Sequence, residues 1–215
     1  MPAALATEQF SEESLNDLLH PDQLVDGEVP EKRVVYGGIS WERYLAIDRA
    51  FGDDRRDPRL FYWEGELEIV TTSNEHERIL RIVSFFLDEH FEQEGIRTEP
   101  RGHATIRRKK IVGAEPDDAW CISPARKFPD IVLEVALSSG GIPKLKVYQQ
   151  YSIPEVWLWK NNALRFYLLR SDRSGYDASP TSRFAPSLNV ELLVECVGIK
   201  DWYDARKQIK RVLAR

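Results

Sequence analysis

Two acidic residues in the middle of this chain stand where a charge is costly. Asp117 opens the segment DDAWCI, and Glu134 interrupts the apolar run IVLEVAL. The apolar residues on both sides of Glu134 predict a strand with both faces covered, where a carboxylate needs a cation, a lysine or a bound metal as its partner. The segment therefore indicates either a metal site or a buried ion pair that is satisfied within the protein.

Strand geometry indicates which acid can act together with Glu134. Asp130 is separated from it by about 13 Å of extended strand, at ~3.3 Å per residue, whereas two ligands of one divalent cation each lie within ~2.0–2.6 Å of it. Asp117 belongs to an earlier strand, and the polar connection SPARK at residues 123–127 allows an antiparallel return. We therefore expect Asp117 opposite Glu134, and Asp130 at the strand entrance, facing solvent.

A pair of lysines follows the second strand. The sequence SSGG at residues 138–141 predicts a flexible turn, and Pro143 fits the first position of a helix that carries KLKVYQQY. At ~100° per residue, Lys144 and Tyr148 share one helical face, and Lys146 points away from it. Only one of the two lysines can easily face the carboxylates.

Upstream periodicity predicts the elements that would support this unit. Ser40 caps a short helix, WERYLAIDRAF, and a hairpin spans residues 61–70 around Glu64-Gly65. A long helix is expected to begin with Asn74 as its cap and to end at Gly95. His76 would lie in its first turn, where the positive end of the helix dipole favours a neutral imidazole or a nearby anion, although a lone histidine there is usually structural.

Side-chain alternation assigns faces within these elements. In the second arm of the hairpin, Leu67 and Ile69 share one face, and Glu66, Glu68 and Val70 share the other. The fold class expected is α/β (α+β): a mixed β-sheet flanked by helices, with the long helix on one face. The strands expected in that sheet lie around Leu67, Ile106, Cys121, Leu133 and Leu158.

Length and composition predict one domain and a cytoplasmic protein. The 215 residues, 42% of them hydrophobic, can bury a full core, so we expect residues 1–38 to be a polar N-terminal extension and residues 39–215 a single domain. No stretch approaches the ~20 apolar residues of a membrane span, and the N-terminus is acidic where a signal peptide would be basic and then apolar.

Charge and cysteine usage narrow the classes of site. The net charge of −5 argues against a broadly basic nucleic-acid surface, although RRKK at residues 107–110 is a local basic run. Cys121 and Cys196 lie far apart without metal-ligand spacing, so neither a zinc site nor a disulfide framework is indicated. We expect both to be small core residues.

Several short motifs resemble one nuclease family in their order and spacing. EPDDAWCI, PDIVLEVALSS and KLKVYQQYSIPEVWLW are similar to motifs of the Uma-type putative restriction endonucleases, a branch of the PD-(D/E)XK nuclease superfamily. The resemblance extends upstream through ISWERYL, WEGELEIV and EHERI, and so covers about residues 40–195. It implies a restriction-endonuclease-like core sheet flanked by helices.

The resemblance also implies a metal-dependent endonuclease that hydrolyses phosphodiester bonds in DNA. The metal ligands would be Asp117 and Glu134 with a backbone carbonyl such as that of Val135, and the ion would be Mg²⁺ or Mn²⁺, because hard cations take oxygen ligands. Lys144 would be the catalytic lysine, with Glu66 and His76 as possible additional site residues. A homodimer is expected, because one compact site hydrolyses one strand at a time.

The chain departs from the superfamily signature at two places. A strict ExK triplet would place its lysine at residue 136, which is Ala136 here, and the resemblance assigns that role to the helix-borne Lys144. The family's SPST-like turn is replaced by SSGG.

Two other classes remain open beside the enzyme. One is a catalytically inactive nuclease-fold binding or regulatory module. The other is a non-nucleolytic metal or ion-pair scaffold in which Asp117, Glu134 and Lys144 neutralise one another. Both carboxylates and Lys144 around one point would favour the enzyme.

Overall fold

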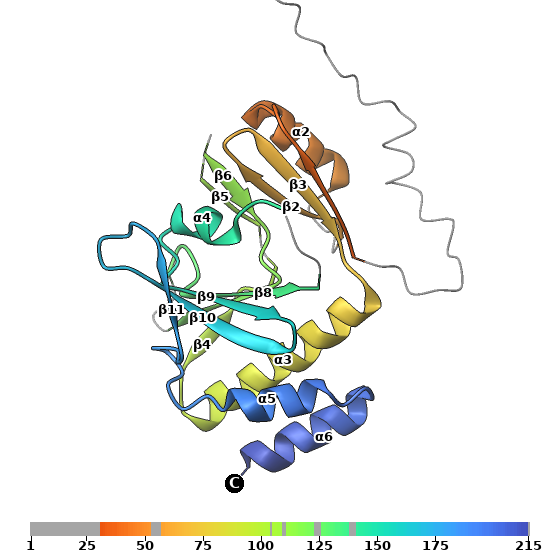
Figure 1. The fold of residues 1–215 in the computed structure, drawn as a ribbon, viewed down its shortest axis with the longest axis vertical. Coiled ribbons are helices and arrows are strands. Elements are labelled where there is room, and N and C mark those ends of the chain that lie inside the picture. Colours follow the sequence, from red (N-terminus) through yellow and green to blue (C-terminus); the bar gives the residue numbers. More distant parts are fainter. Residues whose placement is uncertain are drawn as a thin grey trace, which may run out of the picture.

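A computed structural model describes residues 31–52, 57–103, 105–108, 111–122, 126–137 and 141–214 of the chain. Within these residues the chain forms two β-sheets and five helices (Figure 1). None of the described helices is long and apolar enough to cross a membrane. Three parts of the expected features lie outside the described residues: residues 138–140 of the turn, residues 123–125 of the polar connection, and Lys109 and Lys110 of the basic run.

The first sheet has five antiparallel strands in the order β1-β3-β2-β6-β5. Its strands are β1 (Lys32–Tyr36), β2 (Arg59–Trp63), β3 (Glu66–Thr71), β5 (Ile106–Arg108) and β6 (Val112–Ala114). The predicted hairpin is confirmed as β2 and β3, with a turn in which Glu64 and Gly65 both have positive φ. Strand β1 lies inside the range predicted as an N-terminal extension and pairs along its whole length with β3.

The second sheet has six strands in the order β11-β10-β9-β8-β7-β4. They are β4 (Thr98–Pro100), β7 (Asp118–Ile122), β8 (Ile131–Ala136), β9 (Glu155–Lys160), β10 (Ala163–Leu169) and β11 (Tyr176–Ser179). Strands β8 and β9 are parallel and the other pairs antiparallel, so this sheet is mixed as predicted. The turn between β9 and β10 places Asn161 and Asn162 at φ of 52° and 54°, as a two-residue hairpin turn requires.

The expectation of one continuous sheet was wrong. The strands around Leu67 and Ile106 belong to the first sheet, whereas those around Cys121, Leu133 and Leu158 belong to the second. Alternation identifies a strand and its buried face, but it does not say which other strand supplies the hydrogen-bond partners. Here the pairing of β2 with both β3 and β6 closes a separate sheet.

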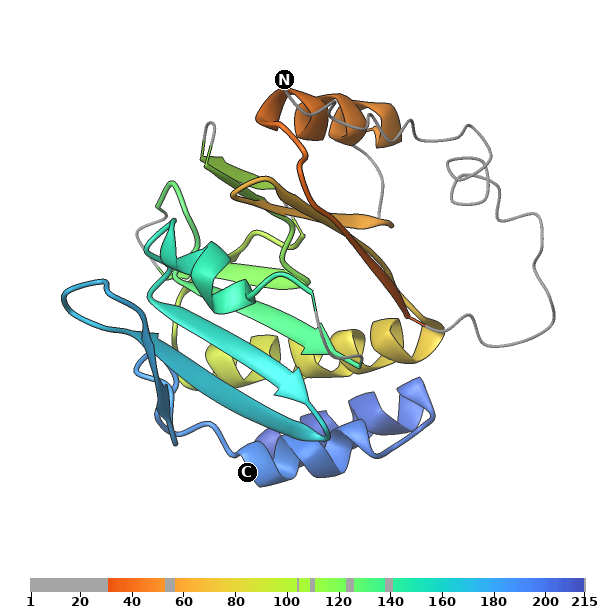
Figure 2. The same cartoon turned by 45° about the horizontal axis from the view of Figure 1, so that its top comes forward.

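The five described helices pack against the two sheets, and all but one of them cover the outer faces (Figure 2). They are α2 (Trp41–Phe51), α3 (Asn74–Gln93), α4 (Lys144–Gln149), α5 (Val190–Val197) and α6 (Trp202–Leu213). Helix α2 packs through Trp41 and Tyr44 on the first sheet, and α3, α5 and α6 form a layer on the second. The inner faces of the two sheets, together with α4, enclose a third apolar cluster.

The cap of the long helix lies one residue earlier than predicted. Ser73, not Asn74, is the N-cap of α3, and its hydroxyl accepts a hydrogen bond from the His76 amide at 3.1 Å. Serine and asparagine are about equally good caps, so the local sequence does not decide between neighbouring positions. The cap of α2 is Ser40, as predicted.

Alternation along β8 and β9 fixes which side chains can meet. Leu133, Val135 and Trp157 belong to the core under the helical layer. Glu134 and Lys160, one strand apart, face the opposite side and line a pocket beside α4. Any chemistry at Glu134 therefore takes place on the inner face of the second sheet.

Candidate active site

Asp117, the residue just before β7, lies opposite Glu134 of β8. The antiparallel register pairs Asp118 with Leu133, so the next step along the ladder sets Asp117 against Glu134. The Val135 amide donates to Oδ2 of Asp117 at 2.6 Å, which fixes the carboxylate at the end of the ladder. Both residues are buried, at 6% and 5% exposure.

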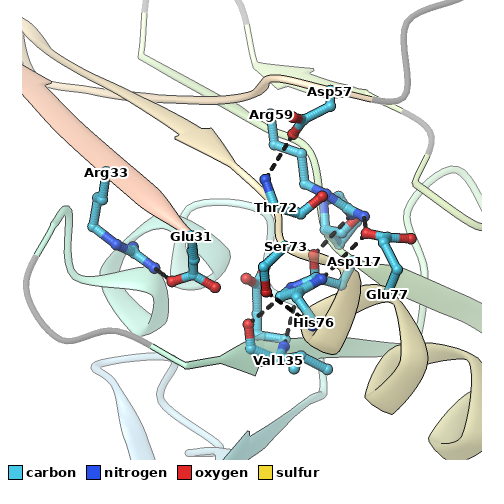
Figure 3. Close-up of polar contacts among 12 residues, drawn as sticks. Glu31, Arg33, Asp57, Arg59, Thr72, Ser73, His76, Glu77, Asp117 and Val135 are labelled. Carbon is cyan, nitrogen blue, oxygen red and sulfur yellow. Dashed lines mark hydrogen bonds and ion pairs between the residues drawn. The ribbon is translucent and has the colours of Figure 1, made fainter. Parts of the chain in front are cut away.

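Two cations neutralise the Asp117 carboxylate (Figure 3). Arg59 of β2 places a guanidinium nitrogen 2.8 Å from Oδ1, and His76 of α3 places Nε2 3.3 Å from Oδ2. Burial alone would raise the pKa of Asp117. The attraction of Arg59, the hydrogen bond from His76 and the amide of Val135 outweigh it and lower that pKa to about 2.

The surroundings of His76 favour a proton on both ring nitrogens. Its Nε2 faces two acceptors, Oδ2 of Asp117 and the carbonyl oxygen of Val135 at 3.1 Å, and its Nδ1 faces the Glu77 carboxylate at 3.2 Å. Burial lowers the pKa of His76, but the hydrogen bonds to Asp117 and Glu77 outweigh this effect and raise the pKa to about 10. The imidazolium thus links the start of α3 to the ends of β7 and β8.

Glu134 is the less stabilised of the two acids. One of its oxygens accepts a hydrogen bond from the Tyr148 hydroxyl of α4. Burial is the largest influence on the pKa of Glu134 and raises it. The positive charge of Lys144 lowers this pKa and the negative charge of Asp117 raises it, so that the pKa is about 7. At neutral pH this carboxylate is poised between its protonated and ionised forms.

Lys144 is held on the opposite wall by a third carboxylate, Glu68 of β3. Its ammonium lies 3.5 Å from Oε2 of Glu68 and over the ring of Phe61. Burial lowers the pKa of Lys144 to about 8, although Glu134 and Glu68 oppose this shift. Lys146 is exposed, so the expected helical phase of the two lysines is confirmed.

Glu68 is fully buried because three donors satisfy it. It accepts from the Ile142 amide at 2.8 Å and from the Arg33 guanidinium of β1, in addition to its ion pair with Lys144. Gly141 has a φ of +85°, and a Cβ at that position would lie 2.6 Å from a Glu68 oxygen. The glycine therefore leaves the space in which Arg33 reaches Glu68.

Glu134 and Lys144 line one pocket of about 390 Å³. Its wall also includes Arg33, Ala136, Pro143 and Lys160. A partly open pocket with a carboxylate of raised pKa and several cations could accept an anionic substrate.

The sequence matches the Uma2 family, described as "Putative restriction endonuclease", over residues 41–199. The chain belongs to that family. Its fold is also similar to the crystal structure of a putative nuclease belonging to DUF820 from Anabaena variabilis ATCC 29413, with 14% identity, a TM-score of 0.49, and coverage of 80% of this chain and 99% of that one. No curated protein matches the sequence.

Family membership supports a nuclease, and the matched range contains Asp117, Glu134, Lys144 and His76. The matched range begins at residue 41, after β1, so Arg33 lies outside it. Of the two glutamates expected on one face of β3, Glu68 reaches the site, whereas Glu66 is exposed and is not among the residues that line the pocket. Glu68 could have been found by the signal that marked Glu134, an acid inside an apolar run, here LEIV.

The expectation that Asp130 faces solvent was wrong. Its side chain is 2% exposed, accepts a hydrogen bond from the Ile122 amide at 2.8 Å and pairs with Arg126 at 3.2 Å. This carboxylate therefore satisfies the last amide of β7. Both cysteines are buried core residues, as predicted.

The donor set fits Mg²⁺ only in part. Among the described residues, no group of three or more His, Cys, Asp or Glu side chains is arranged to hold a metal ion. Mg²⁺ is nevertheless commonly bound by one or two carboxylates together with waters and substrate phosphates. Asp117 and Glu134 would supply those two, although Arg59 and His76 already engage the Asp117 oxygens and the Val135 carbonyl oxygen faces His76.

The raised pKa of Glu134 gives a testable pH dependence of stability. Because the folded protein keeps the Glu134 proton to about pH 7 and the unfolded chain releases it near 4.5, this group makes the free energy of unfolding fall as pH rises between those values. We expect Glu134→Gln to gain stability relative to the wild type across that window in metal-free buffer. Urea unfolding of both proteins at the two ends of the window measures the difference; an unchanged difference would contradict the assignment.

Proposed function

We propose that this protein is a Mg²⁺- or Mn²⁺-dependent endonuclease that hydrolyses phosphodiester bonds in DNA. The observation that carries the proposal is the convergence on one sheet face of Asp117 and Glu134, with Lys144 in the wall of the same pocket as Glu134. Membership of a family described as restriction endonucleases supports DNA as the substrate.

The side chains divide into three roles. Asp117 and Glu134 would hold the divalent cation, which supplies polarisation of a phosphoryl oxygen and a water of lowered pKa when bound. Lys144, with a pKa of about 8, would orient the attacking water or stabilise the charge that develops on the phosphorane. Arg59 and His76 would keep Asp117 ionised and oriented.

Glu68 would act through Lys144, as a positioning residue. In Glu68→Gln the amide oxygen can still accept from the Ile142 amide, but the charge that draws Lys144 and Arg33 is lost. We expect cleavage to fall by about ten- to a hundredfold, the range found when supporting groups of metal sites are changed. The matched control is Glu66→Gln, exposed on the same strand, which should cleave like the wild type; equal activity of the two variants would remove Glu68 from the site.

Substrate class is tested with end-labelled duplex DNA, single-stranded DNA and RNA of one sequence. The proposal expects internal cleavage of DNA in Mg²⁺ or Mn²⁺ and none in EDTA. Cleavage restricted to RNA, or cleavage that persists in EDTA, would contradict it.

The protein is proposed to act as a homodimer, because cutting both strands of a duplex requires two such sites. Static light scattering should then give twice the mass of the chain.

The second candidate is a catalytically inactive module of the same fold. It is favoured by the absence, within the described residues, of a three-ligand metal cluster. The ion-pair scaffold is less well supported, because Lys144 pairs with Glu68 and Asp117 pairs with Arg59.

A further inference from the structure

We infer that Lys160 binds a backbone phosphate of the nucleic acid next to the one that is cut. The inference rests on the proposed function, since it takes DNA as the ligand of the pocket. It adds to that function a substrate-binding residue that lies outside the Asp117, Glu134 and Lys144 group.

The parallel register places Lys160 beside the position that the strict ExK signature would give to a lysine. Ala136 of β8 pairs with Lys160 of β9, and two residues earlier Glu134 pairs with Leu158. Paired residues point to the same side of a sheet, so Lys160 projects from the face that carries Glu134. Glu134, Ala136 and Lys160 also line the same pocket.

The surroundings of Lys160 leave its ammonium available to an anion. The methyl side chain of Ala136 leaves space beside it on the pocket wall, and Lys160 itself is half-buried at the end of β9. In the part of the chain that the structure describes, no hydrogen bond or ion pair engages its ammonium. Lys144 differs in this respect, because Glu68 holds it.

Strand spacing indicates which phosphate Lys160 would contact. Two residues at ~3.3 Å each along the strand and one step of ~4.8 Å between strands put its Cα about 8 Å from that of Glu134. The scissile phosphate must lie at the carboxylates, so the flexible lysine stem reaches the neighbouring phosphate of the same strand. A lysine binds phosphate as a point charge without reading the base, and so Lys160 would contribute affinity but no sequence preference.

The test is the salt dependence of binding to a fluorescently labelled DNA duplex, followed by anisotropy in EDTA so that no cleavage occurs. Lys160→Ala and Lys160→Gln should bind several-fold more weakly than the wild type on every duplex sequence tried. The slope of log affinity against log salt concentration should become less negative by about 1. Lys160→Arg should restore both, and Lys207→Ala on α6, which removes an exposed charge behind the second sheet, should change neither.

The outcomes separate the two proposals. If the wild type binds and cleaves DNA but the Lys160 variants bind with the same affinity and slope, the Lys160 inference is overturned and the proposed function stands. If the wild type cleaves DNA but does not bind the duplex in EDTA at any salt concentration, the Lys160 inference is overturned. If it neither binds the duplex nor cleaves DNA in Mg²⁺ or Mn²⁺, both are overturned. Melting temperatures equal to that of the wild type would show that weaker binding does not come from misfolding, and Lys160→Gln, which keeps most of the side chain, covers the case in which Lys160→Ala is unstable.

Discussion

Replacing Lys144 with alanine is expected to lower the rate of metal-dependent DNA cleavage by about 10²- to 10⁴-fold, the range that one positioned proton-transfer group contributes. We expect this effect because the Lys144 ammonium is buried in the pocket wall, close enough to Glu134 and Glu68 to interact with both electrostatically. Burial lowers the pKa of Lys144 to about 8. A single-turnover cleavage assay on labelled duplex DNA measures the change.

Lys146→Ala is the matched control, because Lys146 lies on the same short helix but is exposed. It should retain most of the wild-type rate. If Lys146→Ala abolished cleavage and Lys144→Ala did not, the correspondence of this helix with the family's motif would be shifted by two residues.

Glu134→Gln is expected to remove both cleavage and the response to Mg²⁺. Loss of a metal ligand costs several kcal/mol of transition-state stabilisation, so the rate should fall at least about a hundredfold at 1.36 kcal/mol per factor of ten. For the wild type, Mg²⁺ at ten times its dissociation constant should add about 1.4 kcal/mol of stability, or about 3–6 °C in melting temperature for a protein of this size. The variant should show little of that rise.

The metal-free melting temperature separates this effect from damage to the fold. Glutamine keeps an oxygen that can accept from the Tyr148 hydroxyl, and it removes a buried charge beside Asp117. Metal-free Glu134→Gln should therefore melt no lower than the wild type. An equal rise with Mg²⁺ in both proteins would place the metal elsewhere.

Local sequence patterns predicted many of the strands and helices that position the site residues. Alternation gave the hairpin of β2 and β3 and its two faces, and helical phase put Lys144 and Tyr148 on one side of α4. The polar residues between β7 and β8 indicated the antiparallel return that sets Asp117 against Glu134. Each of these follows from neighbours in sequence or from one strand connection.

The partners of the site residues could not be predicted in the same way. Arg59 of the first sheet reaches Asp117 beside the second sheet, and Lys144 of α4 reaches Glu68 of the first sheet, although sequence reasoning treated the two sheets as one. Such contacts depend on how the sheets pack, not on the periodicity of either. Asp130 shows the same limit, since its burial depends on an amide in the preceding strand.

The central claim is that Asp117 and Glu134 form a metal-dependent centre that cuts DNA. It is tested most directly by nicking of supercoiled plasmid in Mg²⁺ and in Mn²⁺, comparing the wild type with the double variant Asp117→Asn/Glu134→Gln at equal concentration. The account predicts that the wild type nicks the plasmid, that EDTA prevents it, and that the double variant leaves the plasmid supercoiled. Nicking by the double variant at the wild-type rate, or no nicking by a folded wild type in either metal, would contradict it.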